Sequence, residues 1–259
     1  MQQRRPGFPA RILLPTPGQR PVSGSTTRSG TLPGVPVPAG LGLDSAAVRA
    51  RMVQRLSATG VTAPQVLQAM GSVERHRFVD TGLVNQAYED TSLPIGLGQT
   101  ISKPSIVARM AELLLGAEIV RSTGGLGRVL EVGTGCGYQA AVLSKLAREV
   151  YSMERLRGLH DKARDNLRPL RLANVHLLFG DGMAGFPKGA PYAAIVSAAG
   201  GSTLPAAWCE QLAVGGRLVA PYARADGQQV LLVVDKTAHG LKQTVLEAVH
   251  FVPLKSGVA

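Results

Sequence analysis

The spacing of apolar residues predicts helices in the first part of the folded region. Within residues 44–60, Val48, Met52 and Leu56 recur every four positions between an Asp/Ser start and a glycine stop, as in an amphipathic helix. The segments that follow read as a short helix, a loop without sustained apolar period, and a third helix, over 62–70, 80–103 and 104–115. We therefore expect residues 44–120 to form a helical cap that leads into the main fold.

From residue 128 onward the pattern changes to an alternation of short apolar runs and helical segments. Four strands separated by helices are predicted at 128–133, 149–154, 174–182 and 192–199, with helices over 138–147, 156–168 and 205–212. Three further strands follow without intervening helices, at 215–222, 228–236 and 244–254. This order predicts an α/β fold, a doubly wound and mostly parallel Rossmann-like sheet with an antiparallel edge and an N-terminal helical cap.

The first 40 residues have a different composition. They hold eight of the 17 prolines, six glycines and five arginines, with no acidic residue, whereas the rest of the chain has 23 Lys and Arg against 17 acids. We predict a disordered basic tail over residues 1–43 and a single folded domain over 44–259. A basic arm that contacts nucleic acid or membrane is the alternative, but the arginines are scattered rather than clustered, which favours a solvated extension.

Cysteine and histidine patterns indicate neither a disulfide framework nor a metal site. Cys136 and Cys209 form no CxxC pair, and the five histidines are dispersed. No run of about 18 apolar residues is present, and no secretory signal is recognisable. We expect a cytoplasmic protein without a metal, without a membrane or specific nucleic-acid partner, and monomeric.

The most specific motif is the stretch VLEVGTGCGYQ, residues 129–139, in which a buried strand runs into a glycine-rich loop and then a helix. Glycines allow a sharp turn and close approach of the backbone to a ligand. A dinucleotide site would place its third glycine at position 138, which is Tyr138, and the P-loop pattern is absent. The loop with Gly133, Gly135 and Gly137 instead suits a ligand with adenosine but no phosphate, namely S-adenosylmethionine.

Acidic residues after three successive strands support this interpretation, because open α/β sheets bind ligands at the carboxyl ends of their strands. Glu131 lies inside its strand end and needs a partner such as the methionyl group of the ligand. Glu154 is placed to hold the ribose hydroxyls, and Asp181 with Gly182 to contact the adenine. A helix cap or turn is the alternative role for each acid.

Two stretches together resemble the protein-L-isoaspartate O-methyltransferase family: AYEDTSLPIGLGQTISKPSIVARMAELL at 87–114 and VLEVGTGCGYQAAVLSKL at 129–146. The resemblance extends in unbroken order over about 45–255. It implies methyl transfer from S-adenosylmethionine to the α-carboxylate of L-isoaspartyl residues in damaged proteins or peptides. The methyl ester then closes to a succinimide, whose hydrolysis returns some normal aspartate.

The resemblance also implies roles for single residues. Ser102 is expected to be the catalytic residue, while Gln99, Thr100 and Ile101 are expected to line the cofactor. The full set of expected cofactor residues is Gln99, Thr100, Ile101, Glu131, Gly133, Thr134, Gly135, Gly137, Glu154, Asp181 and Gly182. A purely structural alternative remains open for Ser102, which could cap the helix that begins at Pro104.

Two places depart from the family pattern. The stretch AAGG at 198–201 replaces the commoner AAP, and we expect it to loosen the loop that follows. Ala193 stands where family members usually carry an aspartate. Ala193 lies at the start of the fourth predicted strand. We therefore expect the loss of the aspartate to affect the local support of this strand rather than the chemistry.

The segment GQTISKP, residues 98–104, contains no histidine, carboxylate or cysteine that could act as a base. A free α-carboxyl has a pKa of about 3.5 and arrives ionised near pH 7, so no proton has to be removed. Orientation by neutral donors can then dominate the rate.

Three other functions fit parts of the pattern less well: a methyltransferase acting on RNA, a non-catalytic binding protein, and a nicotinamide dehydrogenase. The RNA enzyme would use the basic arm, but aromatic residues for base stacking are only 4% of the chain. The intact glycine loop and QTIS segment argue against the binding protein, and Tyr138 argues against the dehydrogenase.

Overall fold

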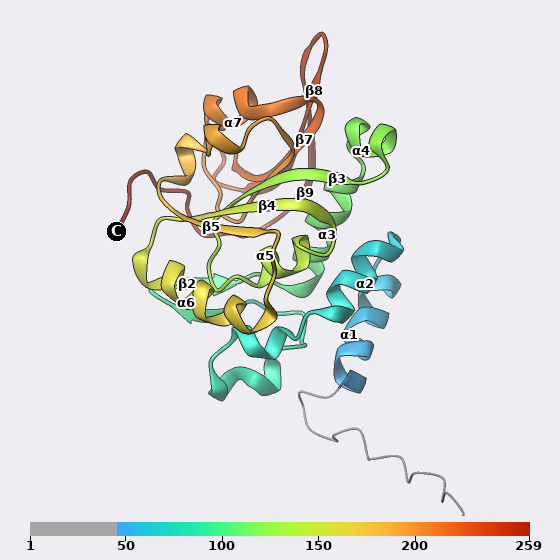
Figure 1. Cartoon of the computed structure of the whole chain (residues 1–259), viewed down its shortest axis with the longest axis vertical. Helices are drawn as coiled ribbons and strands as arrows, with labels where there is room; N and C mark the ends of the chain where they lie inside the picture. The colour runs from blue at the N-terminus through green and yellow to red at the C-terminus, as the bar shows by residue number, and fades with distance from the viewer. Residues whose placement is uncertain (1–45) are drawn as a thin grey trace, which may run out of the picture. The chain divides into compact units, whose positions relative to one another are not determined.

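The computed structural model describes residues 46–259, and Figure 1 shows their arrangement. The basic tail predicted over 1–43 lies outside the described residues. The sheet, the helices that cover it and the helical cap all belong to the described part.

A seven-stranded sheet forms the centre of the fold and confirms the predicted doubly wound topology. Its members in chain order are β3 (Leu126–Val132), β4 (Ala147–Glu154), β5 (Val175–Phe179), β6 (Tyr192–Ser197), β7 (Leu212–Ala223), β8 (Gln229–Thr237) and β9 (Gly240–Ala248). Their spatial order is β5-β4-β3-β6-β7-β8-β9, with parallel pairing from β5 to β7 and antiparallel pairing from β7 to β9. The chain reverses its direction of winding between β3 and β6, and the crevice at their carboxyl ends is where such sheets bind ligands.

Helices cover both faces of this sheet. The flanking elements are α3 (Pro104–Leu115), α4 (Glu118–Thr123), α5 (Tyr138–Leu143), α6 (Arg157–Leu167) and α7 (Ala206–Gln211). Val129 and Val150 of the sheet pack in one apolar cluster with Leu114 of α3, whereas Leu130 packs on the opposite face with Trp208 of α7. This division follows from the alternation of side chains along each strand.

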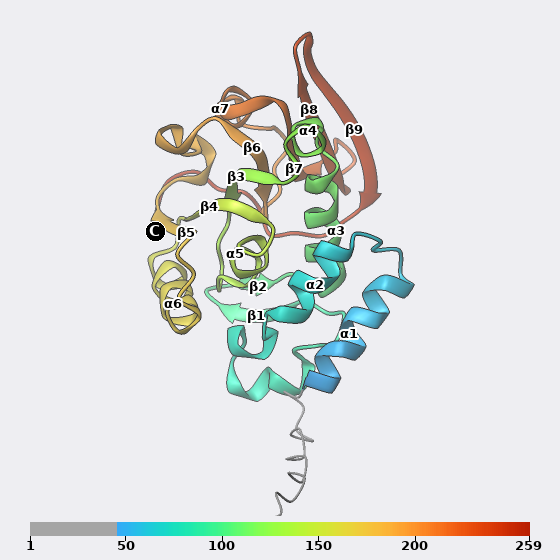
Figure 2. The same ribbon diagram turned by 45° about the vertical axis from the view of Figure 1, so that its right-hand side comes forward.

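The N-terminal cap consists of α1 (Ala46–Ala58) and α2 (Pro64–Ser72), which lie beside α3 in both views (Figure 2). The apolar stripe of α1 is confirmed, because Met52 and Leu56 are buried. Glu112 connects α3 to the helical cap, because its carboxylate accepts hydrogen bonds from the backbone N–H groups of Thr62 and Ala63 just before α2.

The prediction of an unstructured loop over 80–103 was wrong in its second half. Residues Leu93–Gly96 and Gln99–Ile101 form an antiparallel hairpin, β1 and β2, and two 3₁₀ turns, Arg75–Phe78 and Thr81–Gln86, precede it. The strands are only four and three residues long, which is too short for a period to stand out. The turn needs left-handed backbone at Gly96, Leu97 and Gly98, with φ of 97°, 52° and 69°.

Other elements also differ from the prediction. The helix predicted over 138–147 ends at Leu143, and α4 was not predicted. The last strand was predicted to run to Leu254 but ends at Ala248. Beyond it, the Gln229 side chain exchanges two hydrogen bonds with the backbone of Phe251, so a side chain replaces the strand ladder.

Candidate functional site

The first cavity, of about 420 Å³, lies at the carboxyl ends of the central strands. Its volume falls in the range of about 300–1,000 Å³ that is typical of small-molecule sites. Six of the expected cofactor residues line it: Gln99, Thr100, Gly133, Gly135, Glu154 and Gly182. The hairpin, the glycine loop and the ends of β4 and β5 therefore converge on one space.

The glycine loop requires glycine for two different reasons. Gly133, Gly135 and Gly137 have φ of 91°, 57° and 91°, which L side chains rarely adopt. At Gly135 an added Cβ would lie 3.2 Å from Cδ1 of Ile95 on the cavity wall. At Gly137 it would lie 3.0 Å from Cδ1 of Leu167, so this glycine serves the packing of α5 against α6 and does not line the cavity.

Glu154 fixes the loop to the end of β4. One carboxylate oxygen accepts the backbone N–H of Gly135 at 2.9 Å, and the other accepts those of Arg155 and Leu156, each at 2.9 Å. The side chain is almost fully buried but lines the cavity. Three of about four acceptor sites are therefore used, and Oε2 keeps one for a hydroxyl donor in the cavity.

Glu131 is fully buried beneath the loop and does not line the first cavity. Burial raises the pKa of its carboxyl to about 8, and a hydrogen bond from Ser152 opposes this shift. The second oxygen, Oε1, and Nε2 of Gln139 make no hydrogen bond of good geometry in residues 46–259, although the Gln139 amide also lowers the pKa of Glu131. Buried polar atoms normally find partners, so these two atoms mark a place that a polar ligand or a small movement would complete.

Asp181 occupies a different position from the one expected. Its carboxylate accepts the backbone N–H of Met183 at 2.9 Å and that of Gly257 at 2.7 Å. It caps a short turn and holds the C-terminal segment next to the cavity, whereas Gly182 itself lines the cavity. Asp181 therefore acts as a cap, which was the alternative role for this acid, and its contact with adenine stays a prediction.

A second cavity of about 270 Å³ lies beside the first, and a small space of about 40 Å³, called the passage below, shares lining residues with both. Thr100 and Ala198 line all three spaces, and Ser102 lines the passage and the second cavity. Ile101 and Thr134 line the passage. Ser102 therefore stands where a ligand in the first cavity and one in the second would meet.

The structure resolves the capping alternative for Ser102. Helix α3 begins at Pro104 with Lys103 at the cap position, and no side chain caps it there. The carboxylate of Asp90 instead accepts both the backbone N–H and the hydroxyl of Ser105, each at 2.8 Å. Within residues 46–259 the Ser102 hydroxyl has no hydrogen-bond partner. It is free to bind a ligand.

Several lining residues were not predicted from the sequence. Leu97 projects from the hairpin turn over the first cavity, 63% exposed, and the segment 252–255 closes another side. Leu97 lies between two glycines, and this local signal could have marked a strained turn at a ligand. Nothing local distinguishes 252–255, because its place depends on backbone bonds between Gly200 and both Val252 and Leu254.

Ala193 lies at the opposite end of the sheet from these cavities. It is the second residue of β6 and lines a separate surface cavity together with Arg128 and Arg148. Its role in local support stays a prediction.

No helix in residues 46–259 has the length and apolar character to cross a bilayer. Over the same range, no group of three or more His, Cys, Asp or Glu side chains could hold a metal ion.

Comparisons with known proteins point in one direction. The family model described as protein-L-isoaspartate(D-aspartate) O-methyltransferase matches residues 47–259. The chain is 54% identical to a protein-L-isoaspartate O-methyltransferase of Methylibium petroleiphilum, over 99% of this chain and 98% of that protein. It is 57% identical to one from Burkholderia vietnamiensis, over 85% of this chain and 71% of that protein.

Solved structures agree with the sequence relatives. One protein-L-isoaspartate O-methyltransferase superposes with a TM-score of 0.72 and 27% identity, over 81% of this chain and 67% of that one. A second, from Plasmodium falciparum, is described as a putative enzyme of this kind in complex with S-adenosyl-L-homocysteine. It has a TM-score of 0.69 and 25% identity, over 80% of this chain and 98% of that one.

Proposed function

Since the chain belongs to the protein-L-isoaspartate(D-aspartate) O-methyltransferase family, we propose that its first cavity holds S-adenosylmethionine and its second cavity receives the L-isoaspartyl residue. The enzyme transfers a methyl group from S-adenosylmethionine to the α-carboxylate of L-isoaspartyl residues in damaged proteins, which initiates repair through a succinimide. The observation that carries the site assignment is Ser102, which lies at the passage between the two cavities with a free hydroxyl.

The first cavity has features that fit the cofactor. Gly133 and Gly135 leave room for close approach of a ligand, and the Glu154 carboxylate faces the same space with acceptor capacity for ribose hydroxyls. Gly182 lines the wall proposed to contact the adenine.

Glu131 and Gln139 are proposed to serve the methionyl end of the cofactor. A cationic ammonium near the unpartnered Glu131 Oε1 would favour the ionised carboxylate, and the amide of Gln139 is a donor that suits a ligand carboxylate. The bound ligand would thus add a charged partner to the hydrogen bond that Ser152 already donates to Glu131.

This assignment predicts that binding of S-adenosylhomocysteine releases a proton. With its pKa near 8, Glu131 is mostly protonated at pH 7, and the ligand ammonium lowers that pKa. Binding at pH 7 should then release up to about one proton, and affinity should rise as the pH approaches 8. Calorimetry in two buffers of different ionisation enthalpy measures the release.

Glu131→Gln should abolish the release, whereas the exposed Glu118→Gln at the far end of the sheet should leave it unchanged. Equal release from the parent and from Glu131→Gln would contradict the assignment.

The second cavity has the character expected of a site for an anionic group. Lys103 and His250 line it, and no acidic side chain does. When bound, S-adenosylmethionine supplies a methyl group on a sulfonium centre that is open to attack. Ser102 donates a hydrogen bond to one oxygen of the substrate carboxylate and directs the other toward the passage.

No residue of the chain has to remove a proton in this scheme, because the carboxylate is ionised near neutral pH. A neutral hydroxyl donor orients the carboxylate without the strong stabilisation that a buried cation would give it. Orientation can lower the barrier by about 7–11 kcal/mol when reacting atoms are held in the attack geometry. The chain therefore contributes position and exclusion of water rather than acid–base chemistry.

Some expectations remain proposals. These are the division into a tail over 1–43 and a domain over 44–259, a monomeric state, a cytoplasmic location, and the absence of a metal and of a specific nucleic-acid partner. Sedimentation of the full chain would test the monomer, and activity of a tail-deleted form would show whether the tail contributes.

A further inference from the structure

The two walls of the second cavity come from segments that are distant in sequence. One wall is the start of α3, with Ser102, Lys103 and Ile106, and the other is the segment 248–252 that follows β9. The width of the cavity depends on how these two segments are held relative to each other.

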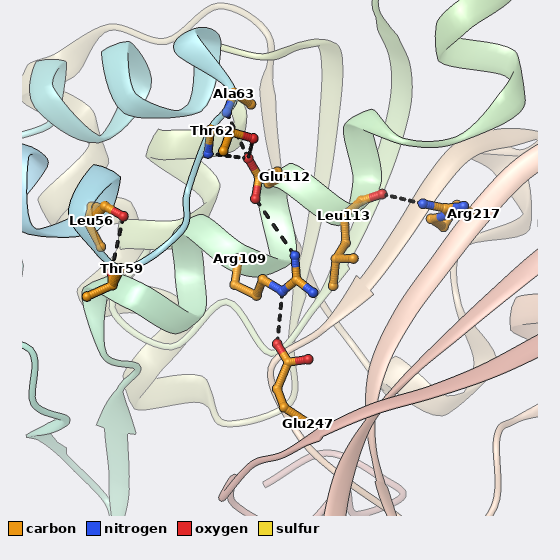
Figure 3. Close-up of polar contacts among 9 residues, drawn as sticks. All are labelled: Leu56, Thr59, Thr62, Ala63, Arg109, Glu112, Leu113, Arg217 and Glu247. Carbon is orange, nitrogen blue, oxygen red and sulfur yellow. Dashed lines mark hydrogen bonds and ion pairs between the residues drawn. The ribbon is translucent and has the colours of Figure 1, made fainter.

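One ion pair joins the two walls at the end of the cavity. Nε of Arg109 donates to Oε1 of Glu247 at 2.9 Å, as Figure 3 shows. Arg109 lies three residues after Ile106, so the two side chains share a face of α3, and Glu247 immediately precedes the wall residue Ala248.

A second acid, Glu112 on the same helix, holds Arg109 in place. The Arg109 guanidinium lies 3.8 Å from Oε2 of Glu112, and Oε1 of Glu112 accepts three hydrogen bonds from Thr62 and Ala63 (Figure 3). Helix α3 is also tied to the sheet, because Arg217 donates to the backbone oxygen of Leu113 at 2.9 Å. The α3 side of the pair is thus fixed. The other side is held by the pairing of β9 with β8 and by the bonds of Gln229 to Phe251, and Glu247 is the point at which it is joined to α3.

The pKa of Glu247 indicates that the two side chains attract each other. Partial burial alone would raise the pKa of Glu247, but the hydrogen bond and charge of Arg109 outweigh it and lower the pKa. The side chains are 38% and 43% exposed, and such pairs contribute only about 0–1 kcal/mol to folding. The pair can therefore be removed without unfolding the protein.

We propose that the Arg109–Glu247 ion pair is a clamp that sets the spacing between the two walls of the second cavity and so the affinity for the isoaspartyl peptide. The proposal rests on the assignment of that cavity to the substrate. Both side chains are positioning residues, because they lie outside the cavity lining and act through Ile106 and Ala248.

The test measures steady-state kinetics with an isoaspartyl peptide for Arg109→Ala, Glu247→Ala and the double variant. The KM for the peptide should rise about threefold to tenfold in each single variant, and the double variant should resemble the singles because the two residues act through each other. The kcat should change less than about twofold, since Ser102 and the cofactor cavity are not altered.

One binding measurement and two further variants test the clamp more strictly. The dissociation constant of S-adenosylhomocysteine should stay at the parent value, and Arg109→Lys should recover part of the lost peptide affinity. Arg77→Ala is the matched control, because Arg77 and Glu74 form a similarly exposed pair, 41% and 40%, that lies outside the cavity lining. It should leave the KM unchanged.

An unchanged peptide KM in both single variants would overturn the clamp, and so would additive effects in the double variant or a parallel loss of S-adenosylhomocysteine affinity. Failure of the proposed function would look different, because the parent protein would then methylate no isoaspartyl peptide at all.

Discussion

Replacing Ser102 by alanine is expected to lower kcat for an isoaspartyl peptide by about 100-fold, the size of effect that a misplacement of about 1 Å produces. The Ser102 hydroxyl is free and stands at the passage between the two cavities. Without it the carboxylate is still ionised and still enters the second cavity, but it is no longer directed at the methyl group. Steady-state kinetics together with binding of S-adenosylhomocysteine measure the effect.

The affinity for S-adenosylhomocysteine should change little in Ser102→Ala, because Ser102 does not line the first cavity. Ser122→Ala, at an exposed serine of α4, is the matched control and should keep the parent kcat. A Ser102→Ala enzyme with the turnover of the parent would remove Ser102 from the mechanism.

Gly135→Val is expected to weaken S-adenosylhomocysteine binding by up to about 100-fold. The backbone at Gly135 has φ of +57°, and even a Cβ would lie 3.2 Å from Ile95 on the cavity wall. Overpacking of this kind costs up to about 3 kcal/mol, which corresponds to about 100-fold in a dissociation constant. Calorimetric titration gives the affinity, and thermal unfolding gives the accompanying loss of stability.

Backbone strain alone would lower stability without acting on the ligand, so a second glycine separates the two causes. Gly124 has φ of +79° and no atom within 4 Å of an added Cβ. Gly124→Val should show a similar loss of stability with parent-like affinity. Equal affinities in both variants would mean that the glycine loop does not approach the ligand.

The centre of the sheet was predictable from the sequence because the strands β3, β4 and β6 are largely buried and apolar and each is followed by a helix or turn signal. β6 is buried throughout, and α6 carries Leu159, Ala163 and Leu167 on a clear stripe. The β1–β2 hairpin was not predictable, because its strands are short and its turn places Leu97 in a conformation that leucine rarely adopts.

The site was predictable where chemistry is local and unpredictable where it depends on packing. The glycine loop and Glu154 follow directly from the strand–loop–helix pattern, and they meet in the structure through the bond between Gly135 and Glu154. Asp181 binds Gly257, and this contact spans 76 residues. No local pattern around Asp181 reports such a contact.

These observations support a chain that acts by positioning the substrate carboxylate rather than by acid–base chemistry. The QTIS segment contains the second strand of the hairpin that lines the first cavity, and it precedes the helix that Glu112 and Arg217 hold in place. A hydroxyl at this junction suffices when the nucleophile is already ionised. The absence of a base in GQTISKP is therefore consistent with catalysis.

The most direct measurement of the central claim compares two peptides that differ only in one linkage, an L-isoaspartyl peptide and its L-aspartyl twin, with labelled S-adenosylmethionine. Methyl transfer to the isoaspartyl peptide alone, lost in Ser102→Ala while S-adenosylhomocysteine still binds, is the predicted result. Equal transfer to both peptides, or to neither while S-adenosylhomocysteine still binds, would contradict it.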